Sequence, residues 1–286
     1  MNLHDSSTSR TDLVDRFRRD GYVVVDLDIP DFDVLSDRLQ TTLADRYDST
    51  HRIENAWRFC EEARTLAVLP SMLETLKALY GREAFPFQTL NFDVGTQQAI
   101  HSDTIHFDSM PAGFMGGVWI AFEDVDTNNG PLIYYPGSHT RPQLTLKDFG
   151  IPNLTGRDPY QLYREVYEPG IAQVIAENDL VPMEAHIRKG QALIWSANLL
   201  HGGKPIIDPA RTRHTQVTHY YFEGCSYHTP LLSDDIKGVY PRYPVDIRTG
   251  RNVGGEVDGR AISVPLKQRM RSWVKNSLRS GTRHQR

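Results

Sequence analysis

The chain has 286 residues, of which 39 % are hydrophobic and 10 % aromatic, and its formal net charge at pH 7 is −4. This composition is typical of a globular protein, and the charge gives no overall attraction to nucleic acid or to an anionic membrane. There is no apolar run long enough for a membrane span and no apolar leader, so we expect neither a span nor a secretion signal. Only Cys60 and Cys225 are present, too few for a disulfide framework, which predicts a cytoplasmic location.

Residues 1–84 are predicted to be mainly helical. Thr11 can cap a short helix that ends at Gly21 and leads into a strand at residues 22–25. Two further segments, residues 31–47 and 70–79, carry apolar side chains at helical spacing.

From Phe85 onward the sequence consists of short runs rich in aromatic and β-branched residues, bounded by glycine, proline or asparagine. They predict strands at residues 87–92, 114–122, 132–135, 191–195 and 215–222. Short strands separated by turn signals favour a barrel or a jelly roll. Residues 140–182 interrupt the strands with two helical patterns, at 160–167 and 171–176, and an insertion of this length often serves as a lid over a site.

We expect one domain that covers residues 1–286. Its jelly-roll core is predicted at residues 85–224, and residues 225–286 form its C-terminal extension. From residue 260 to the end the chain is rich in lysine and arginine and contains no acid. Leu266, Met270, Trp273 and Leu278 fall on one helical face after Pro265, which predicts an amphipathic helix. We expect it to dock on the protein with its basic face in solvent, with contact to a membrane surface or an anionic ligand as the alternative.

The most informative pattern is His101-Ser102-Asp103, followed far downstream by His201-Gly202-Gly203. Two histidines and one carboxylate are the ligand set that holds non-haem Fe(II) while leaving positions open for oxygen chemistry. On or beside a strand, residues i and i+2 point to the same face, so His101 and Asp103 can reach one ion. We expect the two glycines to leave space beside the metal for a bound ligand.

Two alternatives remain open from the residues alone. The triplet His106-Phe107-Asp108 repeats the pattern five residues later, and both triplets cannot supply the same ligand pair. Arg213 can bind a carboxylate with its planar fork, but Arg211 competes for that role.

Six segments, in order, resemble the phytanoyl-CoA dioxygenase family of Fe(II)- and 2-oxoglutarate-dependent oxygenases over residues 12–222. They are FRRDGYVVV at 17–25, HSD at 101–103, VWIA at 118–121, NGPLIYYPGSH at 129–139, HGG at 201–203, and Arg213. The resemblance implies a mainly β fold with a double-stranded β-helix (cupin-like jelly-roll) core on which N-terminal and inserted helices pack.

The resemblance also implies the cofactors and their ligands. Fe(II) would be held by His101, Asp103 and His201, and 2-oxoglutarate by Arg213, with Gln98 and Trp119 beside it and O2 as the second cosubstrate. The spacing to Trp119 selects His101 over His106, and His139 belongs to a turn away from the metal. The implied reaction is hydroxylation of an unactivated C–H bond of a small-molecule metabolite, with release of succinate and CO2.

Two departures from the family pattern concern the cosubstrate pocket. Gly203 stands where several members have a hydroxyl, and Leu132 replaces a polar residue seen in some members. Because halogenases of the family lack the carboxylate ligand, Asp103 disfavours halogenation. Two rival functions remain: a non-catalytic β-barrel that binds a small ligand, and a metal-dependent cupin-type enzyme that does not use 2-oxoglutarate.

The sequence does not identify the substrate or the oligomeric state. Six residues are predicted to line the substrate pocket: His106, Phe107, Met110, Phe114, Tyr134 and Arg141. Each is an aromatic, apolar or basic side chain of the kind found in ligand pockets.

Overall fold

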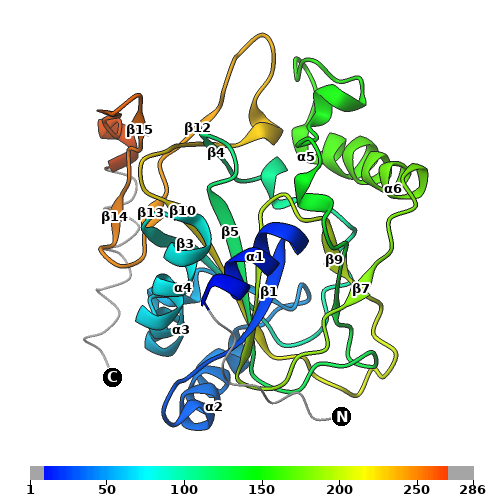
Figure 1. The fold of residues 1–286 in the computed structure, drawn as a ribbon, viewed down its shortest axis with the longest axis vertical. Coiled ribbons are helices and arrows are strands. Elements are labelled where there is room, and N and C mark those ends of the chain that lie inside the picture. Colours follow the sequence, from blue (N-terminus) through cyan, green and yellow to red (C-terminus); the bar gives the residue numbers. More distant parts are fainter. Residues whose placement is uncertain (1–9, 270–286) are drawn as a thin grey trace.

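The computed structural model describes residues 10–269 (Figure 1). Most of the predicted amphipathic C-terminal helix, including Met270, Trp273 and Leu278, lies outside these residues. Within them, residues 266–269 form one helical turn. Within residues 10–269 no helix is both long enough and apolar enough to cross a membrane.

A six-stranded antiparallel sheet forms the centre of the molecule. Its strand order is β1 (Tyr22–Asp26), β8 (Gln191–Ser196), β5 (Met115–Ala121), β10 (Thr215–Phe222), β3 (Ala84–Phe92) and β2 (Arg52–Glu54). Four of the five strands predicted after Phe85, and the strand predicted at 22–25, belong to this sheet. The edge strand β2 has only three residues and was not predicted.

Two smaller antiparallel sheets lie next to the central sheet and complete a mainly β, jelly-roll core. One has the order β7 (Met183–Glu184), β6 (Leu132–Tyr134) and β9 (His201–Gly203), and the other β12 (Pro241–Arg242), β11 (Ser226–His228) and β4 (Asp108–Met110). Residues beyond 224 therefore pair with the core through β11 and β4. Two hairpins follow: β13 (Val245–Asp246) with β14 (Arg251–Asn252), and β15 (Glu256–Val257) with β16 (Arg260–Ala261).

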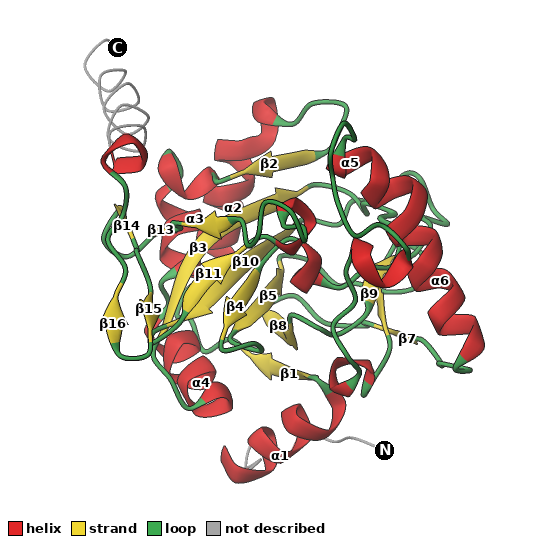
Figure 2. Cartoon of the chain, turned by 90° about the horizontal axis from the view of Figure 1, so that it is seen from above, coloured by secondary structure: helices red, strands yellow, loops and turns green. Residues whose placement is uncertain are grey.

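Four helices cover the outer face of the central sheet: α1 (Arg10–Asp20), α2 (Phe32–Leu43), α3 (Glu61–Ala67) and α4 (Pro70–Tyr80) (Figure 2). Side chains alternate along each strand, so Val118 and Ile120 of β5 pack on these helices while Trp119 and Ala121 face the interior. Both faces of the sheet are covered, and every residue of β5 and β10 is buried.

The insertion forms one helical segment rather than two short helices. It comprises α5 (Pro159–Leu162), a π-helical turn (Tyr163–Tyr167) and α6 (Glu168–Glu177), and it lies beside the sheet that contains β9 (Figures 1 and 2). Short 3-10 helices occupy several connections: Ala44–Arg46, Ala56–Arg58, Asp103–Ile105, Ser138–Thr140, Leu146–Phe149 and Pro230–Leu232.

Candidate metal centre and cosubstrate pocket

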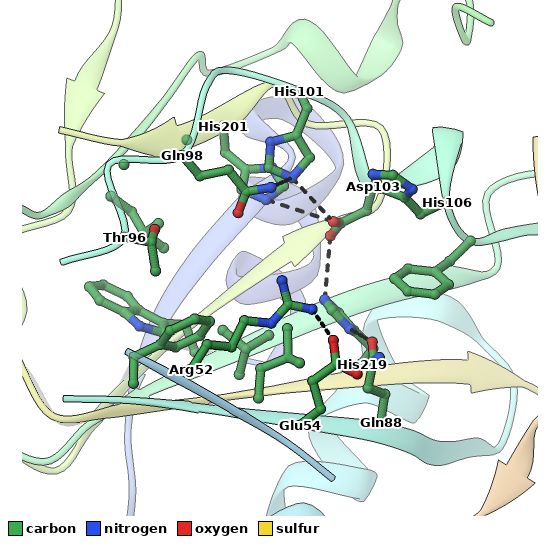
Figure 3. A pocket seen from close by; sticks show the side chains of 18 of the residues that line it. Arg52, Glu54, Gln88, Thr96, Gln98, His101, Asp103, His106, His201 and His219 are labelled. Carbon is green, nitrogen blue, oxygen red and sulfur yellow. Dashed lines mark hydrogen bonds and ion pairs between the residues drawn. The ribbon is translucent and has the colours of Figure 1, made fainter. Parts of the chain in front are cut away.

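Three residues far apart in the sequence come together between the sheets. One ligand atom from each of His101, Asp103 and His201 lies within 4.8 Å of the other two, and all three side chains are buried. The backbones of His101 and His201 exchange two hydrogen bonds, of 2.9 and 3.0 Å, which set the two imidazoles side by side (Figure 3). Asp103 opens a short 3-10 helix directly after this bridge.

The chain leaves the central sheet before it reaches His201. Strand β8 ends at Ser196, and His201 begins β9 in a different sheet instead of extending the same strand. The turn between them lets the chain cross from the central sheet to the smaller one, which is where the partner of His101 is needed.

Both histidines have a fixed tautomer. The Nδ1 atom of His101 lies 2.9 Å from the carbonyl oxygen of Ala99, and that of His201 lies 2.9 Å from the carbonyl oxygen of Leu199. Since a carbonyl oxygen only accepts, each Nδ1 carries the proton and each Nε2 presents a lone pair toward Asp103. Burial lowers the pKa of His201, which keeps that lone pair available. This is the arrangement that metal-ligating histidines require.

The carboxylate of Asp103 lies among three imidazoles and one indole. Burial by itself would raise its pKa, but His201, His101 and His219 hold the pKa below its usual range. The indole Nε1–H of Trp195 donates to Asp103 Oδ2 at 2.8 Å and leaves Oδ1 facing the two histidines, 3.7 and 3.9 Å from their Nε2 atoms. The carboxylate is thus ionised and oriented.

Gly117 leaves room for the indole ring of Trp195. Gly117 of β5 is paired with Trp195 of β8, and a Cβ atom at Gly117 would lie 2.3 Å from the indole ring. With no side chain there, the indole lies over the strand and reaches Asp103.

A third histidine, His219 of β10, was not found from the sequence. Its Nε2 lies 3.8 Å from Asp103 Oδ2 and its Nδ1 lies 2.9 Å from Gln88 Oε1 (Figure 3). Burial lowers the pKa of His219 to about 4. The alternation along the predicted strand 215–222 could have placed it on the inner face with Val217.

Arg213, rather than Arg211, reaches the interior. Arg213 is 1 % exposed and lies 5.3 Å from the ring centroid of Trp119, whereas Arg211 forms a surface ion pair with Asp126 at 3.1 Å. Nη1 of Arg213 donates to the Gly130 carbonyl oxygen, and its Nε has no hydrogen-bond partner. Burial lowers the pKa of Arg213 to about 10, so the guanidinium stays charged at neutral pH.

The two glycines after His201 border the cavity beside the candidate metal ligands, and they also permit a close backbone contact. A Cβ atom at Gly202 would lie 2.7 Å from the Gln98 carbonyl oxygen, and one at Gly203 would lie 2.8 Å from the Gln97 nitrogen. They therefore let the segment that carries Gln98 pack against β9. The Gln98 amide lies 3.3 Å from His101 Nε2 as a result.

A cavity of about 560 Å³ joins these groups. It is bordered by His101, Asp103, His201, Gln98, Trp119, Arg213, His219, His106 and Phe107, together with Tyr160, Tyr163, Arg164 and Glu168 of the insertion and Thr229, Leu232 and Arg242 of the C-terminal part. The insertion thus contributes a wall, in agreement with its expected position near the site.

Four of the six predicted wall residues do not border this cavity. Met110 is 52 % exposed, and Phe114 packs under the guanidinium of Arg82. Tyr134 packs against Tyr22 with the two rings tilted, and Arg141 donates to Asn178. His106 and Phe107 are the two that do line the cavity.

The competing triplet does not form a ligand pair. His106 faces the cavity, with its ring centroid 6.4 Å from that of His101, but Asp108 belongs to β4 and pairs with His228 at 3.6 Å. His139 bonds through Nε2 to the carbonyl oxygen of Arg18 at 3.0 Å, so it ties the turn to α1.

The sequence model of the phytanoyl-CoA dioxygenase (PhyH) family matches residues 10–215. The chain belongs to this family. The family's cofactors are Fe(II), 2-oxoglutarate and O2. A curated relative, the peroxisomal phytanoyl-CoA dioxygenase of Mus musculus, is 26 % identical over 176 residues, which cover 58 % of this chain and 45 % of the relative. The chain thus matches about half the length of that phytanoyl-CoA dioxygenase.

Solved structures share the fold at low sequence identity. The non-haem α-ketoglutarate-dependent epimerase SnoN from nogalamycin biosynthesis has a TM-score of 0.61 and 19 % identity, over 82 % of this chain and 93 % of that one. EctD from S. alaskensis, solved with 2-oxoglutarate and 5-hydroxyectoine, has a TM-score of 0.60 and 20 % identity, over 93 % and 89 % of the two chains. These likenesses agree with the jelly-roll fold of this PhyH family member.

Proposed function

We propose that this protein is an Fe(II)- and 2-oxoglutarate-dependent dioxygenase that hydroxylates an unactivated C–H bond of a small-molecule metabolite, with release of succinate and CO2. The observation that carries the proposal is the buried convergence of His101, Asp103 and His201 in one cavity with Arg213, whose Nε has no hydrogen-bond partner. A cytoplasmic location stays a prediction, and the two cysteines are buried free thiols.

The residues present fit the proposed cofactors. Two imidazoles with free Nε2 lone pairs and one ionised carboxylate form the donor set for Fe(II). A buried arginine whose Nε has no partner is costly unless an acceptor arrives, and a carboxylate supplies one. When bound, iron and 2-oxoglutarate supply the oxidising power for the reaction.

The chain's own residues would bind the metal and the cosubstrate and orient them. His101, Asp103 and His201 would hold the metal on one side and leave the other side toward the cavity. Arg213 would bind the distal carboxylate of 2-oxoglutarate, with Trp119 beside it and Gln98 near the metal. Trp195 would position the carboxylate of Asp103 through its hydrogen bond, and His219 lies beside the same carboxylate oxygen.

The test incubates purified protein with Fe(II), 2-oxoglutarate and a panel of metabolites and measures succinate. We expect at least one compound to stimulate succinate release and to gain one oxygen atom from ¹⁸O2, and we expect His101→Ala to abolish both. Succinate release without oxygen gain would contradict hydroxylation. Absence of 2-oxoglutarate turnover throughout would contradict the dioxygenase.

A further inference from the structure

We propose that Arg242 anchors an anionic group of the organic substrate, so that the enzyme acts on a small organic anion, either a carboxylate or a phosphate ester. The inference rests on the proposed function, because it assumes that the substrate occupies the cavity beside His101, Asp103 and His201. It assigns a role to a charged residue that neither the metal nor the cosubstrate uses.

Arg242 lies on β12 and borders the cavity from the C-terminal part of the chain. Its guanidinium is held in place: the carbon atom lies 4.6 Å from the ring centroid of Phe107 and 5.9 Å from that of Phe87. Its Nη1 donates to Thr229 Oγ1 at 3.0 Å. The remaining buried donor, Nε, has no hydrogen-bond partner.

No acid neutralises Arg242 within ion-pair distance among residues 10–269. The acid on β4 of the same sheet, Asp108, pairs with His228 of β11 at 3.6 Å. The other arginines at the cavity differ, because Arg52 pairs with Glu54, and Arg164 is exposed at the rim. A fixed, unpaired arginine with an unsatisfied buried donor matches a carboxylate or a phosphate, which accept two hydrogen bonds at once.

The position of Arg242 suits a substrate that must also reach the metal. Phe107 lies between it and the site, with its ring centroid 5.1 Å from that of His219, whose Nε2 is 3.8 Å from Asp103. An anion bound by Arg242 would lie away from the metal and leave the metal's open positions to the cosubstrates. The carbon skeleton would then cross Phe107 toward the metal.

The opposite wall agrees with this orientation. The ring of His106 lies 4.7 Å from that of Tyr163 of the insertion, so flat side chains border the path on two sides.

The experiment uses the full chain, loaded anaerobically with Fe(II) and saturating 2-oxoglutarate so that Arg213 is occupied. Benzoate, phenyl phosphate and the neutral benzamide are titrated by calorimetry at millimolar concentrations. We expect one of the two anions to bind and benzamide to bind at least 10-fold more weakly. Arg242→Gln should weaken binding of the anion roughly 10- to 100-fold, and Arg242→Lys should weaken it less. Arg38→Gln, an exposed substitution on α2, is the matched charge control and should change it less than about 2-fold.

Each outcome either identifies the class of anion or contradicts the proposal. Binding of benzoate alone identifies a carboxylate substrate, and binding of phenyl phosphate alone identifies a phosphate ester. If benzamide binds as well as the anions, if no anion binds, or if Arg164→Gln removes binding while Arg242→Gln does not, the inference is wrong. The 2-oxoglutarate-dependent absorption band of the loaded protein, recorded first, separates this failure from a failure of the proposed function.

Discussion

On the outer face of the central sheet, Val118 and Ile120 pack against helices, whereas on the inner face of the same strands Trp119 and His219 border a polar cavity. The outer face buries apolar area, which is the main favourable contribution to folding. The inner face buries charges and polar groups, among them Asp103 and Arg213, whose burial costs free energy unless ligands or partners satisfy them. Changes to the outer face should therefore cost stability, and changes to the inner face should cost function.

The largest effect is expected on the outer face. Leu76 of α4 is fully buried in the cluster that joins the helices to the sheet. Leu76→Ala should lower the free energy of unfolding by about 2–5 kcal/mol, because it removes buried methyl groups and leaves a cavity. Urea denaturation measures this, with Val34→Ala, at a position that is 50 % exposed, as the control. The folded fraction should still bind Fe(II); if binding is lost as well, the two faces are not separable.

The next effect concerns the cosubstrate. Arg213→Gln should raise the KM for 2-oxoglutarate about 10- to 100-fold, since a charge-assisted pair is lost from a buried site. Arg211→Gln is the matched control, and it should change the KM little because a surface ion pair contributes little. Initial rates of succinate release give both values. Equal changes in KM for the two substitutions would contradict the proposed role of Arg213.

A smaller effect is expected from Trp195, whose indole holds the proposed ligand Asp103 and not the metal itself. Trp195→Phe keeps most of the ring over Gly117 but removes the hydrogen bond to Asp103 Oδ2. Iron affinity should fall about 10-fold, as is usual when a partner that orients a metal ligand is lost. Trp57→Phe, which removes an indole bond to Asn55 at 3.1 Å, should leave the affinity unchanged. Anaerobic competition with a metal-sensitive dye measures the affinities, and equal affinities for wild type and Trp195→Phe would argue against positioning.

The smallest effect lies away from both faces. Lys204 and then His186 lower the pKa of Glu184 on β7 to about 2. Because the folded-state pKa is below the unfolded one, this stabilisation is complete above about pH 4.5 and is lost as the pH falls toward 2. After allowance for solvent screening it amounts to about 1 kcal/mol. The free energies of unfolding of wild type and Glu184→Gln, plotted against pH, should converge in that window. The control Glu165→Gln should give a curve parallel to that of wild type. A parallel curve for Glu184→Gln would contradict the assignment.

Much of the fold could be predicted because periodicity is a local property. The helices at 10–20 and 70–80 and five of the six strands of the central sheet appear where the sequence pattern placed them. Strand β2 and helix α3 were missed because three and seven residues carry too little periodic signal. The single helical segment across 159–177 was split at residues 168–170, because Pro169 and Gly170 at the start of α6 are residues that usually interrupt a helix.

The candidate ligands could be found because His101, Asp103 and His201 form a recognisable motif, but their surroundings could not. Trp195 and His219 approach Asp103 from two strands that only the sheet order makes neighbours of the site. Arg242 lies in a part of the chain predicted to be an extension, and it reaches the cavity because β11 pairs with β4. Pairings of this kind depend on tertiary structure, which no short sequence window contains.

The central claim is that His101, Asp103 and His201 together bind the iron on which 2-oxoglutarate assembles. The most direct measurement is the anaerobic absorption spectrum during titration with Fe(II) and 2-oxoglutarate. Wild type should develop a 2-oxoglutarate-dependent band, Asp103→Ala and His201→Ala should not, and His106→Ala should retain it. A wild-type spectrum without the band, or a band that survives loss of His201 but not of His106, would contradict the account.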